Sequence, residues 1–455
     1  MTNKKSSVGI LGAGISGLSA AYALAQEGIA ATVYEQQDQV GGAMYSVRQD
    51  DWLVEQGPNT LMVKSQELWD LLTELGLDDE IVEANQIAKK RFVVKDGKPT
   101  ALPMSVANFL TTPLLSIGAK LRLLKEPFVS PSVQHDESVA TFIERRLGKQ
   151  ILEYGVNPFV AGIYAGDPKE LSVKHTFATL WQMEQEHGSI LKGIIKRDRS
   201  DSPSKRALLS FKNGAQTLPK ALANSLPKKV HYSTNITSVQ HQNGHWQVKG
   251  VTNADHFATT HDAVLSTIPA HSLPGIVDSQ AFNELADLPY APLSVLALGF
   301  KSEQIKHPLD GFGMLIPEVE NYKLLGCLFS STLFPGRAPE GHQLLTCFIG
   351  GARHPKLALK SHQELQQIAL GELRDLLGIQ GDPAFTQHKQ WNKAIPQYKV
   401  GYDHYLSLAK DIEKKNKGIF LDGNFRGGVS VPDCISSGFE TAQKVCTFLK
   451  SVAEK

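Results

Sequence analysis

The sequence VGILGAGISGL, residues 8–18, is followed by a run of small residues and then by ATVYE, residues 31–35. Its first four residues are apolar and are typical of a short strand. Apolar residues then recur at helical spacing, Gly28 is expected to end the helix, and Ala31–Tyr34 is typical of a second strand. The stretch therefore predicts a strand–helix–strand unit, with glycines spaced as G-x-G-x-x-G at its first turn.

Each feature of this unit suits a dinucleotide. Gly12 permits a tight turn after the strand, Gly14 lets the backbone approach a pyrophosphate, and Gly17 lets the helix pack closely. The N-terminus of the helix offers free N–H groups and a partial positive charge to phosphates. Glu35 stands 18 residues after Gly17, where its carboxylate can accept hydrogen bonds from a ribose diol and would repel a 2′-phosphate. A glycine-rich turn without a ligand is the alternative.

The composition is that of an ordinary globular protein. The chain has 455 residues, of which 42% are hydrophobic and 20% charged, enough for a large core and two or three domains. The net charge of +1 gives no reason to expect a nucleic-acid partner. The fifteen histidines show no metal-binding spacing with carboxylates, so no metal site is predicted.

The cysteines and the N-terminal segment bear on the cellular compartment. The four cysteines are Cys327, Cys347, Cys434 and Cys446. No C-x-x-C pair occurs, which argues against a zinc site or a disulfide scaffold and favours buried thiols in a reducing compartment. Neither a signal peptide nor an apolar run of 18 residues is visible. We therefore expect a cytoplasmic protein, with peripheral contact to the inner face of the cell membrane left open.

Two glycine-containing segments follow the acidic residue. Gly41-Gly42 allows the backbone to pass close to a ligand or to bend sharply. Gly57-Pro58-Asn59 is a strong turn signal after the apolar run that begins at Trp52. Because both segments follow Glu35, they are expected to extend the nucleotide site.

Three later stretches are more specific than the glycine motif. They are NPFVAGIYAGD at residues 157–167, EQEHGSIL at residues 184–191 and NFRGGVSVPDCI at residues 424–435. With the segments above, they make the chain resemble the flavin amine oxidase superfamily and, within it, the oxygen-dependent protoporphyrinogen oxidases, over nearly its whole length. Related enzymes often carry a basic or aromatic residue after the paired glycines, whereas this chain has Ala43, so only a backbone contact is expected there.

The resemblance implies an α/β fold in which a Rossmann-like FAD-binding domain is interleaved with a sheet-based substrate domain that carries a helical insertion. The FAD-binding domain is expected to comprise residues 1–85, 211–275 and 401–455. The substrate domain is expected to comprise residues 86–210, with the insertion, and residues 276–400, with the sheet.

The resemblance also implies which residues hold FAD. The expected contacts are Gly12, Ala13, Gly14, Ile15, Ser16, Gly17, Glu35, Gln36, Gly42, Ala43, Met44, Gly57, Pro58, Asn59, Thr60, Ile236, Trp391, Asn424, Val429, Ser430 and Val431. Ile236 is expected to meet the adenine side through its backbone, and Trp391 to lie next to the flavin ring. A C-terminal helix from about Cys434 to Val452 could face the flavin with its N-terminus, although the charge of Asp433 leaves the sign of its effect open.

On the substrate side, the resemblance places Arg91 at a propionate of a tetrapyrrole, where a guanidinium can bind a carboxylate with two hydrogen bonds. Phe334 and Phe348 are expected to pack on the flat macrocycle. The alternatives are that Arg91 is a surface residue of a strand and that the two phenylalanines are ordinary core residues.

Residues 157–167 are expected to line the active site. Gly162 and Ile163 are the predicted contacts, and the small residues Gly162 and Gly166 are expected to leave room for the macrocycle. Asp167 could be a base, but a turn or capping role is the preferred interpretation.

Residues 104–128 are apolar, with scattered prolines and the basic residues Lys120, Arg122 and Lys125. The stretch is too broken to span a bilayer. We prefer a helical insertion that covers the substrate cavity. A surface that rests on an anionic membrane is the other interpretation, and both can hold. Residues 197–205 are the most polar stretch and are expected to form a flexible linker.

Periodicity predicts most of the remaining elements. Helices are expected after Ser65 and Ser138, before Leu226 and over His362–Leu377. Strands are expected at Arg91–Val94, Val230–Tyr232, Asn235–Val239, Trp246–Val248, Asp262–Pro269, Ser294–Phe300, Leu324–Phe329, Leu344–Ile349 and Gly418–Gly423.

The resemblance implies an FAD-dependent oxidase of haem biosynthesis that removes six electrons from protoporphyrinogen IX to give protoporphyrin IX, with O2 as acceptor and H2O2 as product. No catalytic protein residue is predicted, because the flavin carries the electron transfer. The alternatives are a coproporphyrinogen III oxidase that forms coproporphyrin III, an amine or polyamine oxidase, and a non-catalytic FAD-binding partner protein. A homodimer and hand-over of the product to a chelatase are left open.

Overall fold

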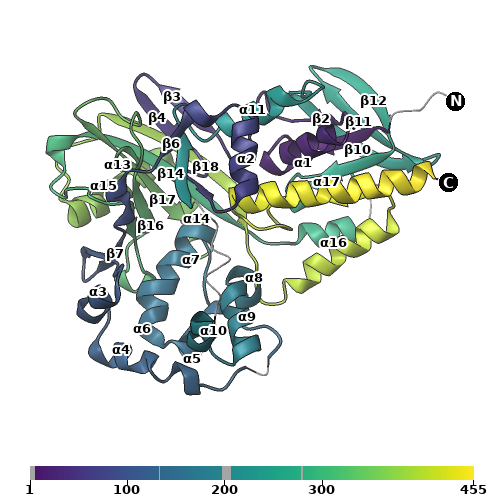
Figure 1. The fold of residues 1–455 in the computed structure, drawn as a ribbon. Coiled ribbons are helices and arrows are strands. Elements are labelled where there is room, and N and C mark those ends of the chain that lie inside the picture. The colour runs from purple at the N-terminus through teal and green to yellow at the C-terminus, as the bar shows by residue number, and fades with distance from the viewer. Residues whose placement is uncertain (1–5, 133, 197–205, 278–279, 455) are drawn as a thin grey trace.

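The structure is a computed structural model that describes residues 6–132, 134–196, 206–277 and 280–454. Figure 1 shows three parts: a nucleotide-binding part that carries both termini, a large twisted sheet beside it, and a group of helices below the sheet. The predicted linker, residues 197–205, lies outside the described residues. The predicted domain boundaries stay a prediction.

The nucleotide-binding part is built on a parallel sheet of order β19-β13-β1-β2. Its strands are β1 (Val8–Leu11), β2 (Thr32–Tyr34), β13 (Ala263–Ser266) and β19 (Ile419–Leu421). Helices α1 (Ile15–Gln26) and α17 (Val431–Ala453) lie side by side on one face, and α11 (Thr217–Ser225) also packs on α1. This confirms the strand–helix–strand unit predicted for residues 8–35.

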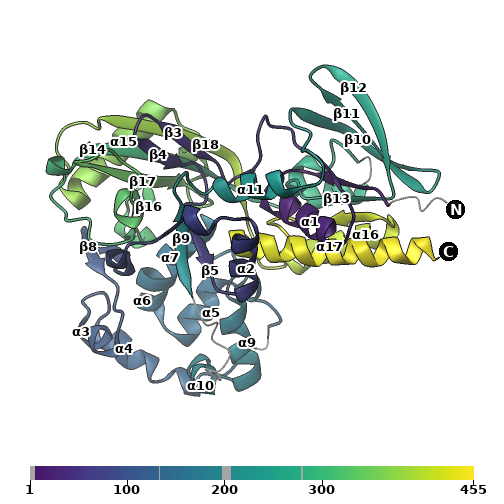
Figure 2. The same ribbon diagram turned by 45° about the horizontal axis from the view of Figure 1, so that its top comes forward.

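A three-stranded antiparallel sheet extends this part of the molecule. Its strands are β10 (Thr234–Gln242), β11 (His245–Thr252) and β12 (Asp255–His261), at the upper right of Figure 2. Helices α12 (Gln280–Ala286) and α16 (Asp403–Lys415) pack on one another nearby. The strand predicted at Val230–Tyr232 is wrong: only His231 forms an isolated bridge, to Tyr34, because the chain crosses the end of β2 and turns into β10.

The second large sheet has seven strands in the order β18-β14-β17-β16-β15-β7-β8. They are β7 (Phe92–Lys95), β8 (Lys98–Ala101), β14 (Tyr290–Lys301), β15 (Gly313–Leu315), β16 (Leu324–Phe329), β17 (His342–Gly350) and β18 (Phe385–Pro396). One face is buried against α15 (His362–Leu377), which begins with a capping box of Ser361 and Glu364. Helix α7 packs on the other face, against β15 and β16.

The helical part follows the β7–β8 hairpin, whose turn lies at Asp96-Gly97. Its helices are α3 (Val106–Thr111), α4 (Ile117–Leu123), η3 (Glu126–Phe128), α5 (Val139–Arg146), α6 (Lys149–Ile151), α7 (Asn157–Tyr164), α8 (Val173–Thr176), α9 (Ala178–His187) and α10 (Ile190–Lys196). A π-helical turn, Leu152–Val156, joins α6 to α7. Buried Leu114 and Leu115 pack on Val93 of β7, so this insertion covers part of the free sheet face.

The remaining elements connect these parts. They are β3 (Ser46–Gln49), β4 (Trp52–Glu55), β5 (Leu61–Val63), α2 (Gln66–Glu74), β6 (Ile81–Glu83), β9 (Ala207–Phe211), α13 (Ser330–Leu333) and α14 (Pro355–Ala358). Strands β3 and β4 form a hairpin, and β9 pairs with β5 and β6. The caps predicted for α2 and α5 are confirmed, because the Ser65 and Ser138 hydroxyls accept from backbone N–H groups.

A buried histidine in the nucleotide-binding part predicts a pH-dependent stability. His261 is 1% exposed, and its ring nitrogens contact Tyr34 Oη at 2.9 Å and Ser7 Oγ at 2.8 Å. Burial, with a smaller effect of Lys228, lowers the pKa of His261 to about 4. The unfolded chain takes up this proton near pH 6.5, whereas the folded chain does so only near pH 4. As the pH falls from about 6.5 to about 4, the free energy of unfolding should therefore decrease by up to about 3 kcal/mol.

Urea denaturation at pH 7 and pH 4.5 checks this expectation. His261→Gln should flatten the pH dependence, whereas replacement of the half-exposed His245 should not. An unchanged slope in His261→Gln would contradict the assignment.

Candidate cofactor and substrate site

The turn between β1 and α1 leaves a free space at its second glycine. Gly12 has φ +98°, which side chains rarely adopt, and a Cβ on Gly17 would lie 2.1 Å from the Gly12 carbonyl oxygen. Gly14 is different: it precedes the first residue of α1 in extended conformation, and a Cβ there would meet no protein atom within 4 Å. Gly12 and Gly17 are thus required by the fold itself, whereas the space at Gly14 is available to a ligand.

Glu35 lies at the edge of this space. One of its carboxylate oxygens accepts from Ala13 N at 2.7 Å, and the other accepts from Gln37 N at 2.9 Å. The Glu35 carbonyl accepts from Thr234 N at 2.8 Å, which brings the start of β10, and Ile236 with it, to the same end of β2. An acidic side chain therefore stands beside the glycine turn, as a ribose-binding residue would.

The later glycine segments join the same site. Gly41 N donates to Ala13 O at 2.9 Å, and a Cβ on Gly42 would lie 3.4 Å from Gly14 Cα. A Cβ on Gly57 would lie 2.0 Å from the carbonyl oxygen of Ala43, so these two segments are in contact. Residues 41–44 and 57–60 thus form a continuous wall that begins at the glycine turn.

Trp391 closes this wall from the seven-stranded sheet. Its indole Nε1–H donates to Gln56 O at 2.7 Å, directly before Gly57. The ring belongs to β18, opposite Leu293 of β14. The two parts of the molecule therefore meet at the segment predicted to lie beside the flavin.

The N-terminus of α17 completes the cofactor side. The helix begins at Val431 rather than near Cys434, because the Ser430 hydroxyl caps it by accepting from Asp433 N at 3.2 Å. The preceding loop is held by two phenols: Tyr398 donates to Asn424 O, and Tyr402 donates to Phe425 O at 2.5 Å. Burial raises the pKa of both phenols, so they remain donors.

Arg91 and Phe334 are linked through Phe312, whereas Phe348 belongs to a separate cluster on the large sheet. Arg91 precedes β7, and its guanidinium lies 5.1 Å from the centre of the Phe312 ring. Phe312 packs against a cluster that contains Phe334, which is 3% exposed. Phe348 lies on β17 opposite Gly326 of β16.

The expectation that Gly162 and Gly166 leave room for a macrocycle is wrong. A Cβ on Gly162 would lie 2.8 Å from Leu315 Cδ2, and a Cβ on Gly166 would lie 2.6 Å from Leu171 Cδ1. Residues 157–164 form helix α7, and its glycine lets the helix approach strand β15 closely. The space that the absent side chains leave is therefore occupied by Leu315 and Leu171.

Ile163 and Asp167 each directly follow one of these glycines. Ile163 is 40% exposed, so it lies at a surface of α7 rather than in an enclosed core. Asp167 accepts from Lys169 N at 2.9 Å, which confirms the preferred turn role.

Sequence reasoning did not single out Phe312 or Leu315, the residues that Arg91 and Gly162 contact. Phe312 stands between two glycines, and no periodic pattern marks it. All four cysteines are buried as free thiols, as predicted. Within the described ranges, no cluster of three or more His, Cys, Asp or Glu side chains is arranged to hold a metal ion. Over the same ranges, no helix has the length and apolar character needed to cross a membrane.

The comparisons with known proteins agree with this architecture. Residues 15–446 match the family model described as flavin containing amine oxidoreductase. The chain is 37% identical over 480 residues to protoporphyrinogen oxidase 2 of Arabidopsis thaliana, with 98% of this chain and 94% of that protein covered. It is 27% identical to coproporphyrinogen III oxidase of Bacillus subtilis, with 99% and 100% covered.

Solved structures share the fold. A protein from Exiguobacterium superposes with a TM-score of 0.83 at 23% identity, covering 98% of this chain and 99% of that one. Putrescine oxidase superposes with a TM-score of 0.66 at 15% identity, covering 97% and 99%. The fold and the glycine-rich turn define an α/β protein of the dinucleotide-binding class. The chain belongs to the flavin containing amine oxidoreductases, and its cofactor is FAD.

The residues present fit this cofactor. The space at Gly14 lies at the N-terminus of α1, where N–H groups and the helix dipole favour a pyrophosphate. Glu35, beside this turn, would bind the ribose, and the capped N-terminus of α17 is the segment predicted to face the flavin. The individual FAD contacts named from the sequence stay predictions.

Proposed function

We propose that this protein oxidises a porphyrinogen, with protoporphyrinogen IX as the preferred substrate, in haem biosynthesis. The observation that carries the proposal is 37% identity, over 98% of the chain, to a protein named protoporphyrinogen oxidase. Coproporphyrinogen III is the second candidate, because the relatives of that name also match the chain over nearly its full length, at 27–29% identity. O2 is the proposed acceptor, with H2O2 as its product.

The chain's own residues would bind and orient the macrocycle. FAD, when bound, supplies the two-electron acceptor. Arg91 would bind a propionate, because its guanidinium carries a positive charge. It lies beside an aromatic ring, 5.1 Å from the centre of Phe312. The aromatic rings around the same strands offer flat apolar contacts and exclude water.

Arg91→Ala should raise the KM for protoporphyrinogen by about 10- to 100-fold, because a charge-assisted hydrogen bond to a carboxylate is lost. The KM of Arg91→Lys should lie between those of the wild type and Arg91→Ala, since an ammonium cannot bind a carboxylate in two-point fashion. Porphyrin fluorescence measures the rate. The control is Lys90→Ala, an exposed neighbour paired with Asp310 at 2.6 Å. If Arg91→Ala and the control behave alike, Arg91 is only a surface residue.

The acceptor is tested by stoichiometry under air. Conversion of one porphyrinogen should consume three O2 and release three H2O2. A sealed oxygen electrode and a peroxidase-coupled assay measure both quantities. Porphyrin formed without O2 uptake would overturn O2 as the acceptor.

We further propose peripheral contact with an anionic membrane through the helical part. Large apolar side chains are exposed on α4, η3 and α10: Ile117 (76%), Leu121 (58%), Leu124 (68%), Phe128 (88%), Ile194 (55%) and Ile195 (83%). Exposed Lys125, Lys192 and Lys196 lie among them. Apolar side chains surrounded by lysines suit an anionic lipid surface.

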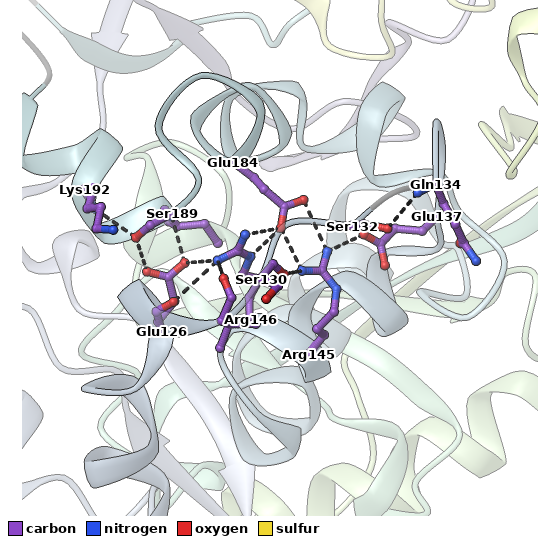
Figure 3. A network of polar contacts seen from close by, with 12 residues as sticks. Glu126, Ser130, Ser132, Gln134, Glu137, Arg145, Arg146, Glu184, Ser189 and Lys192 are labelled. Carbon is purple, nitrogen blue, oxygen red and sulfur yellow. Dashed lines mark hydrogen bonds and ion pairs between the residues drawn. The ribbon is translucent and has the colours of Figure 1, made fainter.

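A buried network holds η3 against α10. The Glu126 carboxylate accepts from Ile190 N at 2.8 Å and Leu191 N at 3.1 Å at the start of α10. The same carboxylate pairs with Arg146 at 3.2 Å, as Figure 3 shows. The network therefore holds the exposed side chains of both elements close together, as a shared lipid-facing surface would require.

Sedimentation with phosphatidylcholine vesicles, with and without phosphatidylglycerol, tests this contact. Wild-type protein should bind the anionic vesicles, and the double variant Phe128→Ser/Ile195→Ser should lose most of that binding. Val452→Ser, at the far end of α17, is the matched control, because Val452 is 52% exposed. Equal binding by both variants would refute the proposed surface.

A further inference from the structure

A buried ion pair joins the two sides of the candidate site. Arg337 Nη1 lies 2.8 Å from Glu55 Oε1, and the side chains are 3% and 4% exposed. Their positions in the sequence differ by 282 residues. Glu55 ends β4 in the N-terminal segment, whereas Arg337 follows α13 in the segment that contains β16 and β17.

Each partner makes further hydrogen bonds. Glu55 Oε1 also accepts from Ala215 N at 2.9 Å, and Oε2 accepts from Ser46 Oγ at 2.5 Å. Arg337 Nη2 donates to Ser210 Oγ at 2.6 Å, and the Arg337 carbonyl accepts from Leu53 N at 3.1 Å. Three stretches of chain, residues 46–55, residues 210–215 and Arg337, therefore meet at one pair of charges.

The pair adjoins residues predicted for both sides of the site. Glu55 stands two positions before Gly57, in the segment that reaches Asn59. Arg337 stands three positions after Phe334, and its guanidinium lies 5.5 Å from the centre of that ring. Glu55, Asn59, Phe334 and Arg337 line one small pocket, together with Ser330 and Thr346.

Because the pair is buried, it can hold the two segments that carry it in a fixed relative position. Burial raises the pKa of Glu55 and lowers the pKa of Arg337, and each charge offsets the effect on the other. A charge left alone at this depth would be strongly unfavourable, so the two segments cannot separate without a large cost.

We propose that Glu55 and Arg337 are positioning residues of the active site. The pair fixes the segment that carries Asn59 against the segment that carries Phe334, and thereby sets where the substrate lies relative to the cofactor. The inference rests on the proposed porphyrinogen oxidation. Misplacement of a substrate by about 1 Å can cost as much as 100-fold in rate, so a small shift at this junction should be measurable.

The test compares Arg337→Lys, Arg337→Met and Glu55→Gln with a matched buried pair outside the site, Arg146→Lys and Glu126→Gln. Arg146 and Glu126 are also fully buried and lie 3.2 Å apart. FAD content, thermal stability, visible circular dichroism of the bound flavin, kcat and KM are measured for each variant.

The Glu55 and Arg337 variants should lower kcat/KM by at least about tenfold and change the visible circular dichroism, with Arg337→Lys closer to wild type than Arg337→Met. The control variants should lose stability and leave the visible circular dichroism of the bound flavin unchanged. Arg337→Lys keeps the charge and serves if the other two variants do not fold.

Variants at Glu55 and Arg337 that change only stability, as the controls do, would overturn the positioning role. If wild-type protein oxidises no porphyrinogen, the proposed function fails. The visible circular dichroism then still decides whether the pair positions the flavin-binding segment.

Discussion

Replacing Gly14 by alanine should leave the fold intact and lower the affinity for FAD by about 100-fold or more, equivalent to about 2.7 kcal/mol. The fold tolerates the change because a Cβ at Gly14 meets no protein atom within 4 Å and the backbone there is extended. FAD binding does not tolerate it, because the methyl group occupies the space in which the pyrophosphate approaches the backbone. Flavin absorbance of the purified variant and titration of apoprotein with FAD measure the effect.

Two other glycines supply the comparison. Gly17→Ala should reduce stability, since its Cβ would lie 2.1 Å from a backbone oxygen. Gly371→Ala, in α15 and with nothing within 4 Å, should retain FAD and gain up to about 1 kcal/mol of stability. A yellow Gly14→Ala protein with wild-type affinity would place the pyrophosphate elsewhere.

Glu184→Ala should lower the free energy of unfolding by about 3–5 kcal/mol, because it leaves a buried arginine without its main partner. Arg146 is 0% exposed and lies between Glu184 and Glu126. Arg145 shares Glu184 at 2.7 Å and also pairs with Glu137 at 2.5 Å. Removal of the central carboxylate therefore disturbs both arginines at once.

Urea denaturation and limited proteolysis of the helical part measure this loss. Glu153→Gln is the matched control, because its partner Lys149 is 71% exposed and the two atoms lie 3.6 Å apart. Surface pairs of this kind contribute little. If Glu184→Ala and Glu153→Gln denature at the same urea concentration, the buried network does not stabilise the helical part.

The nucleotide-binding unit could be predicted from the sequence because its signals are local. The glycine spacing, the strand before it and Glu35 all lie within residues 8–35, and the structure confirms the elements they predict. Helix α15 was predicted with its correct bounds from its apolar periodicity. The structure shows that Ser361 and Glu364 cap its start and that Gly378 ends it.

Other features depend on contacts between distant residues and could not be predicted. Glu55 and Arg337 are 282 positions apart, and neither carries a local signal that names its partner. Gly162 shows the opposite difficulty: its small size suggests free space, but Leu315 of a distant strand fills that space. Strand β12 was not predicted because its exposed, polar residues lack an apolar alternation.

Anaerobic reduction of the bound flavin tests the central claim most directly. Purified protein with its FAD is mixed, without O2, with protoporphyrinogen IX, coproporphyrinogen III or a polyamine, and the flavin absorbance is followed. We expect protoporphyrinogen IX to bleach the flavin fastest and the polyamine to leave it unchanged. The proposed function would be contradicted if only the polyamine bleached the flavin, or if neither porphyrinogen did so.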